Sequence, residues 1–156
     1  MPASTDQGPW WAAVVVWAVV NAVNLLQAAG FLSRIPAGSM AVNHALGWVM
    51  IALAAPAAVA LVAFAHARAG WLSWSGPAAY LAFAGLMLAV DYLRPVEFRA
   101  PARLAILVPF LLLFFGSILL MGLPMFRLHR GLWLVTAATA VVMIVSMLAA
   151  MSRGVG

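Results

Sequence analysis

Residues 104–123 read LAILVPFLLLFFGSILLMGL, and the apolar stretch continues without a charged side chain until Arg127. The hydrocarbon core of a bilayer is about 30 Å thick, so an α-helix needs roughly 20 apolar residues to cross it. The stretch meets that length, and inside lipid a single segment satisfies its backbone hydrogen bonds only as a helix. It therefore predicts a transmembrane helix.

Similar windows recur along the chain, separated by charges, Pro/Gly clusters and Trp residues. We therefore expect an all-α integral membrane bundle that forms a single domain over residues 1–156. The five expected transmembrane helices lie at about 10–30, 41–67, 77–93, 103–123 and 132–151. Because the third window is the shortest, the competing topology has four transmembrane helices and a re-entrant segment at 77–93.

The composition agrees with a membrane environment. Apolar residues make up 67% of the chain and charged residues 7%, with a mean hydropathy of +1.12, whereas a soluble domain has about 25% charged residues. The net charge of +5 comes from eight Arg and three acids. These Arg stand singly between apolar runs, which is typical of membrane-edge anchors and not of a nucleic-acid surface. The lack of Lys and the abundance of Ala suggest a GC-rich bacterial genome, so we expect the cell inner membrane.

The Arg residues also predict an orientation, because short cytoplasmic segments carry more Arg than external ones. With the N-terminus outside, five Arg fall in cytoplasmic segments and three in external ones. The first group is Arg34, Arg94, Arg99, Arg103 and Arg153, and the second is Arg68, Arg127 and Arg130. We therefore expect the N-terminus outside and the C-terminus in the cytoplasm.

Polar side chains of the first three windows fall at one depth in this topology, on the cytoplasmic side. A polar group facing hydrocarbon without a partner costs several kcal/mol, so such a concentration indicates mutual pairing or a ligand. The predicted ligand-binding residues are Asn21, Asn24, Gln27, Asn43, His44, Asp91, Tyr92, Arg94, Glu97 and Arg99. Those expected to line one common cavity are Asn21, Asn24, Asn43, His44 and Asp91.

The charged group at the end of the third window also has a structural interpretation. Pro95 disfavours helix at the residue before it, and the resulting turn allows Asp91 and Glu97 to converge. Alternatively, Asp91 pairs with Arg94 and Glu97 with Arg99, and the two ion pairs merely close the end of a helix. The amides of the first window have a comparable alternative, since Asn and Gln often join membrane helices by hydrogen bonds.

Several chemistries lack the residues that they need. The absence of Cys excludes disulfides, thiolate catalysis and iron–sulfur clusters. HExxH, GxSxG, Walker and GxGxxG patterns are also absent. No metal site is predicted, and no cofactor is indicated. If the protein is an enzyme, its acid and base must come from Asp91, Glu97 and His44, and the sequence names no reaction.

The leading hypothesis is a polar inner-leaflet pocket that binds or processes a membrane-dissolved amphiphile, such as a lipid, an isoprenoid or a quinone-like molecule. The tail would lie between helices, and a polar or phosphorylated head would meet Arg94 or Arg99. One alternative is a structural or accessory subunit of a membrane complex, in which the first-window amides pair with a partner subunit. Another is a small homodimeric transporter. No nucleic-acid partner is expected.

Overall fold

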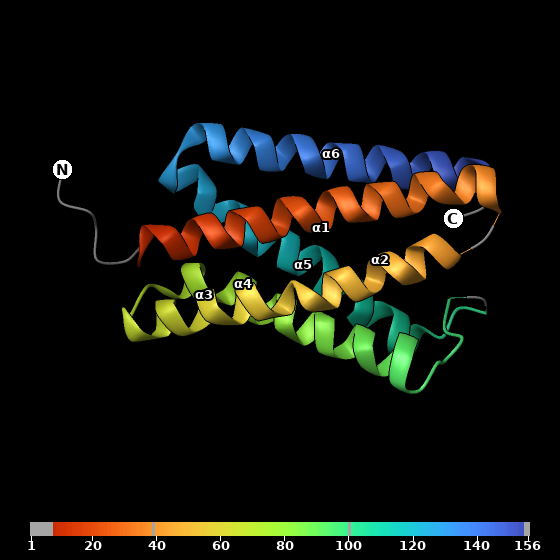
Figure 1. Cartoon of the computed structure of the whole chain (residues 1–156), viewed down its shortest axis with the longest axis horizontal. Helices are drawn as coiled ribbons and strands as arrows, with labels where there is room; N and C mark the ends of the chain where they lie inside the picture. The colour runs from red at the N-terminus through yellow and green to blue at the C-terminus, as the bar shows by residue number, and fades with distance from the viewer. Residues whose placement is uncertain (1–7, 39, 100, 155–156) are drawn as a thin grey trace.

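The computed structural model describes residues 8–38, 40–99 and 101–154, which form an all-helical bundle (Figure 1). The elements are α1 (Trp10–Ala37), α2 (Ala41–Ala52), α3 (Ala54–His66), α4 (Trp71–Met87), the π-helix η2 (Leu88–Leu93), α5 (Leu104–Leu128) and α6 (Arg130–Ser152). Taken as continuous segments, they give five helices of 23 to 28 residues that are long and apolar enough to cross a membrane. The prediction of five transmembrane helices is confirmed, and the chain is a small multi-pass helical membrane protein.

Three helix boundaries differ from the predicted ones by five residues or more, one of them the end of α5, which lies at Leu128 instead of near residue 123. The first helix continues to Ala37 instead of ending near residue 30, and Gly38 then ends it in the left-handed conformation (φ 59°), donating its N–H to the Arg34 carbonyl. Only glycine adopts this conformation without cost, which explains the stop. The third helix begins at Trp71 instead of Pro77, so with η2 it reaches 23 residues. At that length it spans a bilayer, and the reason for the re-entrant alternative disappears.

The second transmembrane segment is broken at Leu53, where α2 meets α3. Leu53 has a ψ of −11°, far from the usual helical value of about −42°. Pro56 follows three residues later in the first turn of α3 and has no N–H for the Ala52 carbonyl. The break is therefore a proline kink. By contrast, α5 continues as one helix through Pro109 and Pro124.

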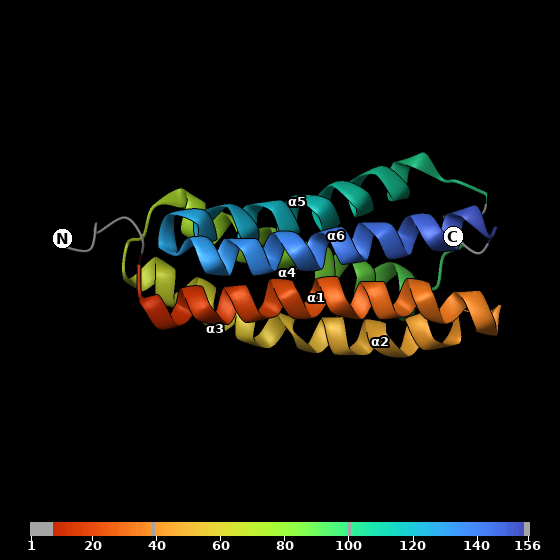
Figure 2. The ribbon, with the colours of Figure 1, turned by 90° about the horizontal axis from the view of Figure 1, so that it is seen from above.

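The helix α1 occupies the middle of the bundle. It runs between α6 and the α2–α3 segment in two perpendicular views (Figure 2), and half of its most apolar window is buried, against 22–33% for the other four helices. On the far side, α4 packs closely on α5 because Gly76 faces the backbone of Leu120 and Met121. Small residues allow membrane helices to approach in this way. The remaining apolar faces point outward and suit contact with lipid.

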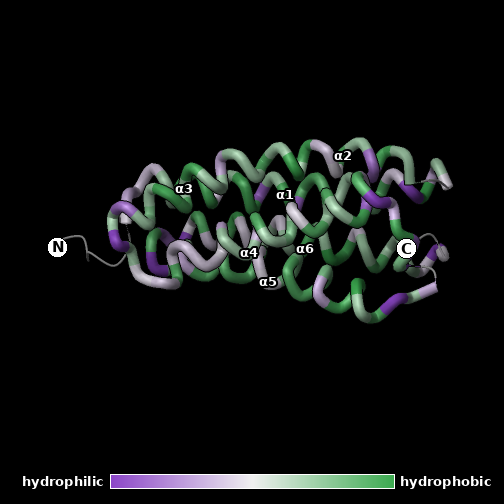
Figure 3. The backbone as a smooth tube through the Cα atoms, turned by 90° about the horizontal axis from the view of Figure 1, so that it is seen from below, coloured by the Kyte–Doolittle hydropathy of each residue, from purple (hydrophilic) through white to green (hydrophobic). Residues whose placement is uncertain are grey.

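Hydrophilic residues gather toward the two ends of the bundle, with apolar residues dominating between them (Figure 3). We call one end of the bundle the Arg34 end: it holds the C-termini of α1 and α6, the start of α2, η2, and residues 94–99 and 101–103. The opposite end, formed by the starts of α1, α4 and α6 and the C-termini of α3 and α5, is the Trp71 end. An aromatic belt surrounds this second end, consisting of Trp10, Trp11, Trp71, Trp74 and Trp133. Such belts mark a membrane–water interface.

Candidate functional site

The amides of Asn21 and Asn24 pair with α6 near the middle of the bundle. The Asn21 Nδ2 atom donates to the Trp17 carbonyl (2.7 Å) and to Thr136 Oγ1 (3.2 Å), and Asn21 Oδ1 accepts from Thr139 Oγ1 (2.7 Å). The Asn24 Nδ2 atom donates to Thr139 Oγ1 at 3.0 Å. Both Asn side chains are buried, and Asn24 Oδ1 has no partner among the described residues. We call these two Asn and two Thr residues the polar seam.

The amides of Gln27 and Asn43 serve contacts between α1 and α2. The Gln27 Nε2 atom donates to the Met50 sulfur at 3.2 Å. In the amide orientation that satisfies both of its sides, Asn43 donates from Nδ2 to the Gly30 carbonyl (2.8 Å) and accepts at Oδ1 from Arg34 Nη2 (2.6 Å). Arg34 is buried, with 8% of its surface exposed. The predicted stripe on α1 is thus engaged within the chain, so it gives no support to pairing with a partner subunit.

A ring stack connects η2 with α2 at the Arg34 end. The Tyr92 hydroxyl donates to the His44 carbonyl at 2.6 Å. The Tyr92 ring lies 4.4 Å from the His44 ring and 4.3 Å from the Trp48 ring, measured between centroids. His44 thus takes part in packing through its backbone and its ring face, and its imidazole is exposed.

An ion pair holds the segment 94–99 against η2, at the end of α4. The Arg99 Nη1 and Nη2 atoms donate to the two Asp91 carboxylate oxygens at 2.8 and 2.9 Å, and the guanidinium lies over the buried Phe98 ring at 4.2 Å. The alternative pairing considered from the sequence, Asp91 with Arg94 and Glu97 with Arg99, is therefore not the one formed. The π-helix and the extended turn after it bring Arg99 back to Asp91, whereas Arg94 and Glu97 stay exposed and form no ion pair within the described chain.

The hollow at the Arg34 end measures about 410 Å³ and brings Asp91 and Glu97 together, as the turn at Pro95 allowed. It is lined by Val90, Asp91, Pro95, Val96, Glu97, Phe98 and Arg99. These residues belong to one continuous segment of the chain. The Asn and His side chains predicted to share a cavity with Asp91 instead have the separate contacts described above. These contacts therefore give no support to one common cavity, because α6 and the α1–α2 contact satisfy the amides.

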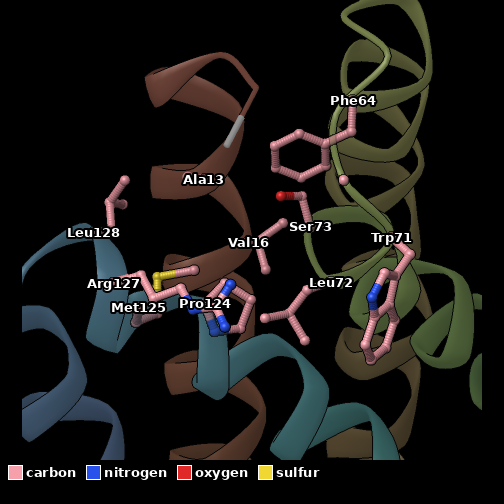
Figure 4. Close-up of a pocket in the computed structure, with 11 residues that line it drawn as sticks. Ala13, Val16, Phe64, Trp71, Leu72, Ser73, Pro124, Met125, Arg127 and Leu128 are labelled. Atoms are coloured by element: carbon pink, nitrogen blue, oxygen red, sulfur yellow. The ribbon is translucent and has the colours of Figure 1, made fainter. Parts of the chain in front are cut away.

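A second cavity, of about 340 Å³, lies between four helices at the Trp71 end (Figure 4). It is lined by Ala13 and Val16 from α1, Phe64 from α3, Gly70, Trp71, Leu72 and Ser73 at the start of α4, and Pro124, Met125, Arg127 and Leu128 from α5. Most of these side chains are apolar. Figure 4 shows the Arg127 side chain beside Met125 and Pro124 at the end of α5, on the other side of the view from Trp71. We call this space the Trp71-end cavity.

The start of α4 and Arg127 near the end of α5 give the cavity a positive character. Gly70 precedes α4 in an extended conformation and supplies no side-chain cap, and the first turn of α4 contains no acid. Arg127 forms no ion pair with any described residue. Sequence reasoning missed this site because its residues come from four separate segments. The available signal was the group Arg127 and Arg130, which has no neighbouring carboxylate in the sequence.

The comparisons with known proteins do not assign the chain to a family. No family model matches it, and neither the curated proteins nor the solved structures give a match. Among the described residues, no group of three or more His, Asp or Glu is close enough to hold a metal ion. The geometry of the two ends of the bundle is therefore the evidence that bears on function.

Proposed function

We propose that this membrane protein binds a membrane-dissolved amphiphile in the Trp71-end cavity. The observation that carries the proposal is the cavity itself: a partly open space of about 340 Å³ between α1, α3, α4 and α5, lined mainly by apolar side chains together with Ser73 and one guanidinium. Pockets for small molecules have volumes of about 300–1,000 Å³ and combine apolar walls with a few polar groups. An amphiphile has the matching division into tail and head.

The depth of the cavity in the bundle suits a ligand that enters from lipid. Trp71 lines the cavity and belongs to the aromatic belt, which marks the level of the headgroups. A ligand with its head at that level would place its tail against Val16, Phe64 and Met125, toward the bundle core. Both parts of the molecule would then remain in their preferred surroundings.

The hollow at the Arg34 end fits an amphiphile less well. Its walls come from the single stretch 90–99, so it offers no space between helices for a tail. Its Asp91 and Arg99 charges already compensate one another through two hydrogen bonds. A ligand head would have to compete with that ion pair. We therefore propose the ligand site at the Trp71 end and not among the polar residues predicted to lie in the inner leaflet.

We place the Arg34 end in the cytoplasm, since it carries five of the eight Arg residues. The Trp71-end cavity then opens at the outer leaflet of the cell inner membrane. A reporter that is active only in the cytoplasm tests this orientation when it is fused after residue 156. Signal from that fusion is expected, and signal from an N-terminal fusion alone would reverse the orientation.

Filling the cavity tests the proposed function. Ala13 lines the cavity from α1 and is 7% exposed, so Ala13→Phe should occupy the space of the tail. Ala18→Phe is the matched control, because Ala18 is exposed on the same helix. Native mass spectrometry of protein extracted in mild detergent should show one amphiphile retained by the wild type and by Ala18→Phe.

The amphiphile should be lost from Ala13→Phe, while the thermal unfolding midpoint in detergent stays within a few degrees of that of the wild type. Equal retention by Ala13→Phe and the wild type, with both folded, would refute binding in this cavity. If Ala13→Phe unfolds, the smaller Ala13→Val variant supplies the same comparison, with a partial loss of ligand expected.

A further inference from the structure

Charge and shape at the Trp71 end also indicate what kind of amphiphile would bind, an inference that rests on the proposed function. We infer that the ligand has an anionic head, a phosphate ester or a carboxylate, and a single acyl chain. Arg127 and the first turn of α4 would hold the head, and the space between α1, α3 and α5 would hold the chain.

The distribution of charge is the first argument. The described part of the Trp71 end carries Arg68, Arg127 and Arg130 and no Asp or Glu. The two carboxylates of the described chain, Asp91 and Glu97, lie at the opposite end. Arg127 therefore faces the cavity without a carboxylate partner among the described residues. Arg127 is itself exposed, so an anionic head would supply that partner at the mouth of the cavity through charge-assisted hydrogen bonds, which are stronger than neutral ones.

The second argument is the start of α4, which lines the same cavity as Arg127. The helix has no side-chain cap and no acid in its first turn, and the N–H groups of a first turn have no carbonyl partner within their own helix. The Ser73 N–H already donates to the Gly70 carbonyl at 2.9 Å, so the Trp71 and Leu72 N–H groups are the candidates for the head. The positive end of the helix dipole adds to the charge of Arg127.

The volume and the walls of the cavity limit the tail. At about 340 Å³, the cavity is near the lower limit of the range for small-molecule pockets, roughly 300 Å³. That space favours one acyl chain over the two chains of a common phospholipid. The apolar part of the lining consists of aliphatic, aromatic and thioether groups, among them Val16, Phe64, Leu72, Met125 and Leu128.

The test compares three single-chain probes that share one dibrominated acyl tail and differ in the head. The heads are a free carboxylate, a glycerol phosphate and an uncharged glycerol. Bromine quenches Trp fluorescence on contact, and Trp71 lines the cavity. Titrations of the purified full chain in nonionic micelles, with the Trp71→Phe variant subtracted as the background from the other Trp residues, give an apparent Kd for each probe.

Both anionic probes should bind on the order of tenfold more tightly than the uncharged probe, because hydrogen bonds to charged groups discriminate at that level. Arg127→Gln should remove most of this difference. Arg130→Gln is the matched control, since Arg130 lies at the same end outside the cavity lining. It should change each Kd by no more than about twofold. Inorganic phosphate at the concentration of the probe should displace neither anionic probe.

The outcomes separate the inference from the proposed function. Equal affinity for all three probes would overturn the anionic head and leave amphiphile binding intact. No Trp71-dependent quenching by any probe would refute the proposed function as well. A loss in Arg130→Gln as large as in Arg127→Gln would overturn recognition inside the cavity. Displacement by inorganic phosphate would show that the site takes a free anion instead of an amphiphile.

Discussion

The two ends of the bundle use their charged residues in opposite ways. At the Arg34 end, Asp91 and Arg99 form a bidentate ion pair and Asn43 joins Arg34 to Gly30, while Arg94 and Glu97 stay exposed. At the Trp71 end, Arg127 has no ionic partner in the described chain and faces a cavity between helices. The Arg34 end, which has more polar residues, thus uses several of them in pairs within the chain. The site that suits a ligand is the poorer one, where an unpaired charge adjoins empty apolar space.

The largest effect should come from adding a methyl group at Gly76, where α4 and α5 meet. A Cβ atom there would lie 2.7 Å from the Met121 nitrogen and 2.8 Å from the Leu120 carbonyl carbon, so the two helices would have to separate. We expect Gly76→Ala to lower the free energy of unfolding by about 3 kcal/mol, the upper range for overpacking. Thermal unfolding in detergent measures the change.

Gly85→Ala is the control on the same helix, because a Cβ atom at Gly85 would meet nothing within 4 Å. It should be neutral or stabilising by about 0.5–1 kcal/mol. Comparable unfolding midpoints for the two variants would show that close α4–α5 packing does not support the Trp71 end.

The next largest change in stability should come from substitutions in the polar seam. They also test whether these residues pair within the chain or bind the ligand. Asn21 has three hydrogen-bond contacts, whereas Asn24 has one and an unpartnered buried oxygen. Asn21→Leu should therefore destabilise the protein by about 1–2 kcal/mol, and Asn24→Leu should be close to neutral because it removes an unsatisfied acceptor. Neither variant should alter amphiphile retention. Loss of the ligand with unchanged stability would indicate that the ligand binds at the polar residues of α1, as first predicted.

The smallest effect should come from the carboxylates of the Arg34 end. Asp91→Asn breaks a bidentate ion pair, but the Arg99 side chain is 46% exposed, so the cost should be only about 1 kcal/mol. Glu97→Gln should cost less than about 0.5 kcal/mol, since Glu97 is exposed and unpaired in the described chain. Unfolding midpoints compared at one pH test the difference. Equal losses would indicate that Glu97 also takes part in a charge network.

The sequence was sufficient for the number and class of the helices, because the requirement for about 20 apolar residues is a strong local constraint. Helix ends were less predictable. The first helix was expected to end near residue 30, yet α1 continues through Pro36 and stops at Gly38. A proline in the last turn removes one hydrogen bond, whereas the left-handed glycine redirects the chain. Pro77 is likewise accommodated inside α4.

The candidate site was less accessible to prediction, for two physical reasons. The partners of Asn21 and Asn24 are Thr136 and Thr139, 115 to 118 residues away in the chain, and spacing within one helix carries no information on them. A cavity also depends on how the helices pack in three dimensions, which the spacing of residues along one helix does not reveal. The convergence of Asp91 and Glu97 was predictable because both lie on one turn.

The most direct test of the central claim is to map where an amphiphile binds along the chain. An anionic single-chain probe with a photoactivated diazirine in its tail would be cross-linked to the full chain in nanodiscs, and the adducts identified by mass spectrometry of peptides. Our account predicts adducts concentrated in residues 64–73 and 124–128, competed by unlabelled probe and lost in Ala13→Phe. Adducts concentrated in residues 90–99, or spread evenly over the lipid-facing helices without competition, would contradict it.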